Sequence, residues 1–142
     1  MAFLLDTNVL SEVMKREPDP TVIRWLNALS TTQCFLSVLT VGEITKGVEL
    51  MADGRRKETL RNWLDRDLAG RFRGRILDVD QATAEAWGRL DADARRIGRP
   101  LPVIDGLLLA TAQRHRLTFV TGDVADCEGR GVPVLDPSSP TP

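Results

Sequence analysis

The chain of 142 residues contains only two cysteines and one histidine. Cys34 and Cys127 are too few and too far apart in the sequence to indicate a disulfide framework or a zinc site. Cys34 lies in an apolar segment, where we expect a small buried side chain. Because His115 is the only histidine, a nuclease mechanism based on paired histidines is disfavoured. The scarcity of cysteine favours a reducing compartment, and we expect the protein in the cytoplasm.

Long apolar runs and an excess of charge of one sign are also absent. No apolar stretch approaches the roughly 20 residues of a membrane-spanning helix. No basic leader precedes the first apolar segment, so we expect no membrane partner. Lys and Arg number 19 and Asp and Glu number 20, which gives a net charge of −1. This balance argues against a broadly basic surface for binding nucleic acid.

Short apolar segments alternate with helical periodicities along the chain. Five segments have the length and composition of buried strands, namely residues 2–5, 34–39, 75–79, 118–121 and 132–135. Apolar residues recur at helical spacing within residues 8–15, 22–29, 40–51, 60–68, 87–97 and 102–116. This alternation predicts an α/β fold of three layers, in which a mostly parallel sheet of about five strands has helices on both faces.

The composition indicates a single globular domain, with 42% hydrophobic and 27% charged residues. We expect this domain to cover residues 1–137 and to be followed by a flexible, proline-rich tail at residues 138–142. Residues 55–97 are rich in predicted helix, and we expect them to form a small lobe or hairpin beside the sheet.

Four acidic residues lie where apolar segments end or are interrupted: Asp6, Glu43, Asp105 and Asp123. Asp6 ends the first predicted strand and Asp123 follows the fourth. Glu43 and Asp105 fall in the first turns of predicted helices. Ligands of parallel sheets bind at the carboxyl ends of the strands, so we expect all four acids at one edge of the sheet.

Each acid also has a structural explanation. Glu43 completes the capping box Thr40-Val41-Gly42-Glu43, and Asp123 follows Gly122 as a turn residue would. Asp105 could stabilise its helix N-terminus, which is worth about 0.3–1 kcal/mol. An unpaired buried carboxylate costs several kcal/mol, however, so one shared cation explains the four acids better than four separate roles.

Gathered carboxylates repel one another, and a divalent cation removes that repulsion. Ligand sets made only of oxygen suit Mg²⁺ or Mn²⁺ rather than zinc. Two such ions about 3.5–4 Å apart can activate a water molecule and stabilise the leaving oxygen of a phosphodiester. The acids therefore predict nuclease or phosphatase chemistry.

Four short motifs together resemble a known family. The first contains Asp6-Thr7-Asn8, the second ends at Glu43, the third is Pro102-Val103-Ile104-Asp105, and the fourth is Thr118-Phe119-Val120-Thr121-Gly122-Asp123. In order and spacing they resemble PIN-domain ribonucleases, in particular the VapC toxins and their FitB-like branch. The resemblance extends over almost the whole chain, to residues 131–137. Each motif alone is weak, but the four together are specific.

This resemblance implies an endoribonuclease that depends on Mg²⁺ or Mn²⁺ and acts as the toxin of a toxin–antitoxin pair, with RNA as its substrate. It implies that Asp6, Glu43, Asp105 and Asp123 are the catalytic and metal-binding acids, supported by Asn8 and Thr121. It also implies a homodimer that is inhibited by a cognate antitoxin. Such an antitoxin is a small DNA-binding protein whose C-terminal segment wraps the toxin and places a basic side chain in the acidic site.

The chain departs from the family pattern after Thr121. Gly122 and Asp123 stand where Arg and Asn are common, and Cys127 stands where Phe is common. Either Asp123 or Asp126 could therefore be the fourth acid; we favour Asp123, which is nearer the strand end, and keep Asp126 as a supporting or alternative residue.

Two other functions remain open on the sequence. Asp6 could be the nucleophile of a phosphotransfer protein, although Asn8 stands where aspartate-nucleophile phosphatases usually carry a second Asp. The acids could instead form a non-catalytic cleft that binds an arginine of a partner protein.

Overall fold

A five-stranded parallel sheet forms the middle layer of the computed structural model, which describes residues 1–139. The strand order is β3-β2-β1-β4-β5, and every neighbouring pair is parallel. The strands are β1 (Phe3–Leu5), β2 (Cys34–Ser37), β3 (Ile76–Leu77), β4 (Thr118–Val120) and β5 (Val134–Leu135). The predicted α/β fold is confirmed, although all five strands are shorter than predicted.

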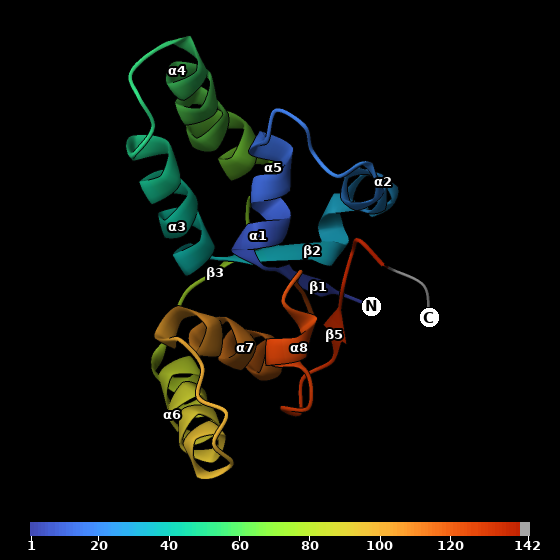
Figure 1. Ribbon diagram of the computed structural model, residues 1–142, viewed down its shortest axis with the longest axis vertical. Coiled ribbons are helices and arrows are strands. Elements are labelled where there is room, and N and C mark those ends of the chain that lie inside the picture. The colour runs from blue at the N-terminus through green and yellow to red at the C-terminus, as the bar shows by residue number, and fades with distance from the viewer. Residues whose placement is uncertain (140–142) are drawn as a thin grey trace.

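Helices cover both faces of this sheet (Figure 1). One face carries α1 (Thr7–Leu10), the 3₁₀ turn η1 (Ser11–Met14), α2 (Pro20–Ala28), α3 (Val38–Glu49), and a continuous helical stretch made of α4 (Arg55–Asn62), the π-helical η3 (Trp63–Leu68) and α5 (Ala69–Arg71). The opposite face carries α6 (Gln81–Arg96), α7 (Val103–His115) and α8 (Val124–Cys127). A second 3₁₀ turn, η2 (Thr31–Gln33), leads into β2.

Alternating side chains of the strands divide the interior into two cores, as the two-residue period of a strand requires. Phe3 and Leu5 point into the core beneath α1–α5, whereas Leu4 between them points into the core beneath α6–α8. In β4, Phe119 and Val120 divide in the same way. Because both faces of the sheet are buried, the positions at which the strands end are closely defined.

The prediction of a lobe at residues 55–97 is wrong. Its first half, α4 to α5, packs with α3 on one face of the sheet, and its second half, α6, packs against α7 on the other face (Figure 1). Strand β3 lies between the two halves and pairs with β2. Each half has an apolar stripe of its own, and the sheet has an apolar surface on both faces. Placing the two halves on opposite faces therefore buries both stripes.

The predicted capping box at Thr40 is also wrong. Helix α3 begins at Val38, and Ser37 caps it by accepting a hydrogen bond from the Leu39 amide at 3.0 Å. Thr40 is fully buried inside the helix, and Glu43 lies in its second turn. A capping role for Glu43 is therefore excluded.

Two smaller predictions, the burial of Cys34 and the exposed position of His115, are confirmed. Cys34 is buried, and His115 is exposed in the last turn of α7. No helix within residues 1–139 is both long enough and apolar enough to cross a membrane. At the start of the predicted tail, the amide and hydroxyl of Ser138 donate to Asp136 Oδ1; residues 140–142 lie outside the described part of the chain.

Replacement of Leu108 by alanine tests the role of α7 in the core. Leu108 is 0% exposed, so Leu108→Ala should lower the free energy of unfolding by about 2–5 kcal/mol. Leu50 is 77% exposed, and Leu50→Ala should change it by no more than about 0.5 kcal/mol. Urea unfolding followed by circular dichroism measures both values. Equal effects of the two substitutions would contradict the packing of α7 described above.

Candidate active site

Asp6 lies at the carboxyl edge of the sheet, directly after β1. Its backbone amide donates to Val120 O at 2.8 Å, which holds it against the end of β4. Its side chain is only 7% exposed. Oδ1 accepts from the Thr7 amide at 2.7 Å, and Oδ2 accepts from the Thr121 hydroxyl at 2.8 Å. Thr121, which we predicted to be a supporting residue, thus orients the Asp6 carboxylate.

Asn8 connects the first helix to the loop after β4. Its Nδ2 donates to Asp123 Oδ2 at 3.2 Å, and its Oδ1 accepts from the Gly122 amide at 3.1 Å. The Asp123 amide in turn donates to Thr121 Oγ1 at 3.0 Å. These contacts hold Asp123 close to Asp6 although the two residues are far apart in the sequence.

Thr7 connects Asp6 to Glu43, a role that the sequence analysis missed. Its hydroxyl donates to Glu43 Oε1 at 2.5 Å and lies 3.3 Å from Thr40 Oγ1. The sequence signal that could have identified Thr7 was its hydroxyl side chain immediately after Asp6. Only the packing of α3 beside α1 reveals that this hydroxyl reaches Glu43.

The charges of the acids act on one another. The pKa of Asp6 is raised from its usual 3.8 to about 6. Burial is the largest cause; hydrogen bonds from Thr121 and Thr7 oppose it, and the charges of Asp105 and Asp123 add to it. Burial also raises the pKa of Asp105, with additional contributions from Glu43, Asp123 and Asp126. Asp6, Glu43, Asp105 and Asp123 therefore share one electrostatic environment at the carboxyl edge of the sheet.

Asp123 lies nearer the centre of this group than Asp126. The charge of Asp123 raises the pKa of both Asp6 and Asp105, whereas among these two carboxyl groups Asp126 acts only on Asp105. Both side chains are exposed. This geometry favours Asp123 as the fourth acid and leaves Asp126 at the rim.

The donor chemistry of the site suits a hard divalent cation. Within residues 1–139, none of the ion pairs involves Asp6, Glu43, Asp105, Asp123 or Asp126. Burial raises the pKa of the nearby Cys127 thiol to about 12, with contributions from Asp6, Asp105, Asp123 and Asp126, so this thiol is protonated at neutral pH in the metal-free protein.

The spacing of the acids limits how an ion could be held. In the described part of the chain, no three Asp, Glu, His or Cys side chains lie close enough together to ligate one ion directly. Mg²⁺ usually binds through one or two carboxylates and keeps several of its waters. The acids therefore fit an ion that is held partly through water.

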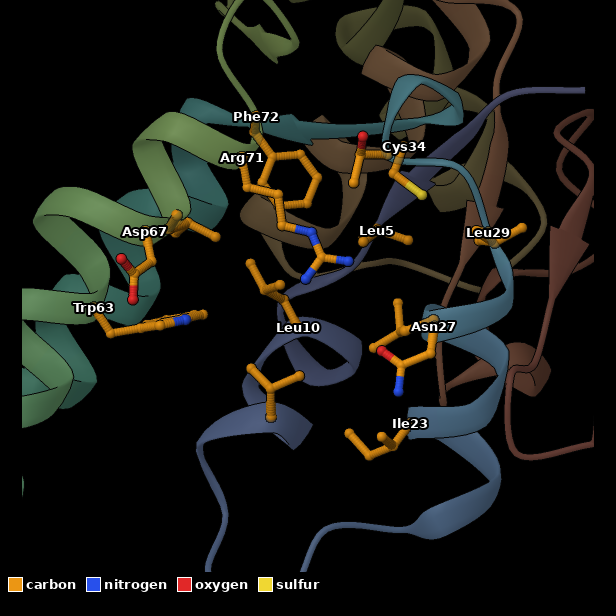
Figure 2. Close-up of a pocket in the computed structure, with 14 residues that line it drawn as sticks. Leu5, Leu10, Ile23, Asn27, Leu29, Cys34, Trp63, Asp67, Arg71 and Phe72 are labelled. Atoms are coloured by element: carbon orange, nitrogen blue, oxygen red, sulfur yellow. The ribbon is translucent and has the colours of Figure 1, made fainter.

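A separate apolar hollow lies on the α1–α5 side of the sheet (Figure 2). Its volume is about 160 Å³, and none of the acids of the site lines it. Ile23, Asn27 and Leu29 line it from one side, and Trp63 and Arg71 from the other (Figure 2). The half-exposed Val13 also lies on its wall.

The raised pKa of Asp6 predicts how stability depends on pH in metal-free buffer. The folded protein holds the Asp6 proton more tightly than the unfolded chain, so this residue's contribution to stability is present below about pH 4 and is lost as the pH rises through about 6. Between about pH 4.5 and about pH 7.5, Asp6→Asn should gain about 2 kcal/mol of stability relative to the wild type.

Urea unfolding in the presence of a chelator measures this difference. Asp65→Asn is the matched control, because Asp65 is exposed on η3; its stability relative to the wild type should not change with pH. A constant difference between Asp6→Asn and the wild type over this range would show that Asp6 ionises normally.

Comparisons with known proteins agree with this architecture. The PIN-domain family model matches residues 3–125. The toxin FitB of Neisseria gonorrhoeae is 35% identical over 134 residues, covering 94% of this chain and 96% of that protein. The VapC ribonuclease Y4jK of Sinorhizobium fredii is 33% identical, covering 96% and 98%. The crystal structure of FitAcB from Neisseria gonorrhoeae superposes with a TM-score of 0.91 at 35% identity, covering 95% of this chain and 97% of that one. The chain belongs to the PIN-domain family.

Proposed function

We propose that the protein is an endoribonuclease that uses Mg²⁺ or Mn²⁺ and acts as the toxin of a toxin–antitoxin pair. The observation that carries this proposal is the group of mutually repelling carboxylates at the carboxyl edge of the sheet, none of which forms an ion pair with a basic side chain within residues 1–139. The names of two relatives, a toxin and a ribonuclease, support the same function.

Asp6, Asp105, Glu43 and Asp123 would hold the ion, directly or through its waters. When bound, the ion supplies a Lewis acid that lowers the pKa of a water molecule and stabilises the leaving oxygen of the phosphodiester. The acids alone would repel an RNA phosphate, so they can accept this substrate only after their charge has been offset.

Three polar residues keep the acids in position before substrate arrives. Thr121 and the Thr7 amide fix the two oxygens of Asp6, while the Thr7 hydroxyl fixes Glu43. Asn8 fixes Asp123. Hydrogen bonds of this kind lower the reorganisation needed during the reaction, since the ligands already have their bound orientation.

A toxin requires an inhibitor in the cell that makes it. We place the apolar segment of a cognate antitoxin, a small DNA-binding protein, in the hollow of Figure 2. An apolar groove of this kind suits a helix or extended peptide with spaced apolar side chains. We further propose that the toxin is a homodimer and acts in the cytoplasm.

Loss of either central acid tests the catalytic proposal. Asp6→Asn and Asp105→Asn should each lower the rate of RNA cleavage in Mg²⁺ or Mn²⁺ by at least about 10²-fold, because each removes a charge that holds the ion. The measurement is cleavage of total RNA with each ion and with a chelator, and the wild type should be inactive in the chelator.

Asp65→Asn is again the control and should cleave at the wild-type rate, since Asp65 is exposed and outside the acidic site. Circular dichroism of each variant at the pH of the assay checks that a loss of activity does not come from unfolding. Wild-type cleavage by either acid variant would refute the assignment.

A charge in the hollow should separate inhibition from catalysis. Val13→Asp places a carboxylate on the wall of the hollow, where it would have to be desolvated on binding of an apolar segment. We expect it to weaken binding of the antitoxin encoded beside the toxin gene by at least about tenfold, with RNA cleavage unchanged.

Ile97→Asp is the matched control, because Ile97 is 61% exposed at the end of α6 on the other face of the sheet. Calorimetric titration measures affinity, and light scattering measures whether the free toxin has twice the mass of one chain. Antitoxin binding by Val13→Asp at wild-type affinity would exclude the hollow as the docking site.

A further inference from the structure

Trp87 on α6 lies directly against Gly106 on α7. A Cβ atom built on Gly106 would be 3.0 Å from Trp87 Nε1 and 3.1 Å from Trp87 Cδ1. Contacts this short are rare for real Cβ atoms, so even alanine at position 106 would force the indole or the helix to move by a few tenths of an ångström. Glycine weakens a helix relative to alanine, and the close approach of the indole explains its presence here.

Gly106 differs in this respect from the other glycines inside helices of residues 1–139. Cβ atoms built on Gly42, Gly47, Gly70 and Gly88 would have no neighbour within 4 Å. Gly88 directly follows Trp87 on α6 and is exposed. The close contact is therefore specific to the place where α6 meets the first turn of α7.

The indole is held by packing rather than by a hydrogen bond. Its Nε1 atom is buried and has no hydrogen-bond partner among residues 1–139. Buried tryptophans usually place this N–H group against an acceptor. The contact of Trp87 with Gly106 therefore depends on the shape of the indole ring and not on its N–H donor.

Gly106 immediately follows Asp105, the acid that α7 brings to the site. On its other side α7 is fixed against the sheet, because Leu108 and Leu109 are fully buried in the core with Leu4 and Phe119. The helix is thus held between the sheet and the Trp87 ring. Where the ring does not yield to a larger residue 106, the first turn of α7 moves, and Asp105 moves with it.

We propose that Trp87 and Gly106 are a positioning pair, which sets how far Asp105 lies from Glu43 and Asp123. Neither residue takes part in the chemistry; Trp87 acts through the backbone of α7. This inference rests on the proposed nuclease function for its kinetic consequences, but the position of Asp105 can be measured without any activity.

The test first enlarges residue 106 and then replaces the Trp87 ring that the larger side chain would meet. Gly106→Val should displace the first turn of α7 by more than Gly106→Ala. A misplacement of about 1 Å can lower a rate about 10²-fold, so we expect kcat for RNA cleavage to fall about 10²-fold in Gly106→Val with little change in KM. Leucine is smaller than tryptophan and can turn its methyl groups aside, so Trp87→Leu/Gly106→Val should regain most of the kcat of Trp87→Leu.

Gly88→Val is the matched control, because it makes the same substitution on the neighbouring helix where the structure leaves open space. It should keep wild-type kcat. Crystal structures of Gly106→Val and of the double variant should show Asp105 displaced in the first and restored in the second.

The two hypotheses fail in different ways. If the wild type does not cleave RNA, the proposed function is wrong, and the displacement of Asp105 in the crystal structures alone decides the positioning role. If Gly106→Val leaves Asp105 in place, or if the double variant does not restore it, the positioning pair is refuted. If the Gly106→Val protein does not fold, the same comparison is made with Gly106→Ala and Trp87→Leu/Gly106→Ala.

Discussion

The repulsion among carboxylates at the carboxyl edge of the sheet is the constraint on which the other features of the site depend. Burial is the main reason that the pKa of Asp6 rises to about 6, and the charges of Asp105 and Asp123 add to the rise. The fold keeps this unfavourable group in place with short hydrogen bonds from Thr7 and Thr121 and with the backbone bond to Val120. Stability is thus given up locally to keep these acids together, a common compromise at functional sites.

Each acid reaches the site from a different element, and the two cores determine where those elements end. Asp6 follows β1, and Asp123 follows β4, whose pairing with β1 fixes the relative height of the two residues. Glu43 comes from α3 on one face, and Asp105 comes from α7 on the other. Packing on both faces of the sheet therefore controls a single charged group, so a core substitution distant from the acids can alter their spacing.

The sequence predicts well what depends on local pattern. Alternating apolar segments predicted the parallel sheet, and an acid after a buried strand predicted the location of Asp6. The sequence predicted poorly what depends on packing between segments that are far apart in the chain. The capping box at Thr40 was a plausible local pattern, but burial of Thr40 against the sheet and a cap at Ser37 prevailed. Neither the bond from Thr7 to Glu43 nor the contact of Trp87 with Gly106 has a local signature, since each joins residues of separate helices.

In the proposed function, catalysis and inhibition both depend on the uncompensated negative charge of the acids. A divalent ion relieves the repulsion of the acids, and so would a guanidinium or ammonium group that an antitoxin brings to the site. An inhibitor of this kind needs little shape complementarity to the acids, because the attraction between opposite charges has little dependence on shape. Its specificity must then come from elsewhere, and the mostly apolar hollow on the α1–α5 side offers a second surface that none of the acids of the site lines. Division of the two tasks between charge and apolar contact would let the antitoxin block the site without resembling RNA.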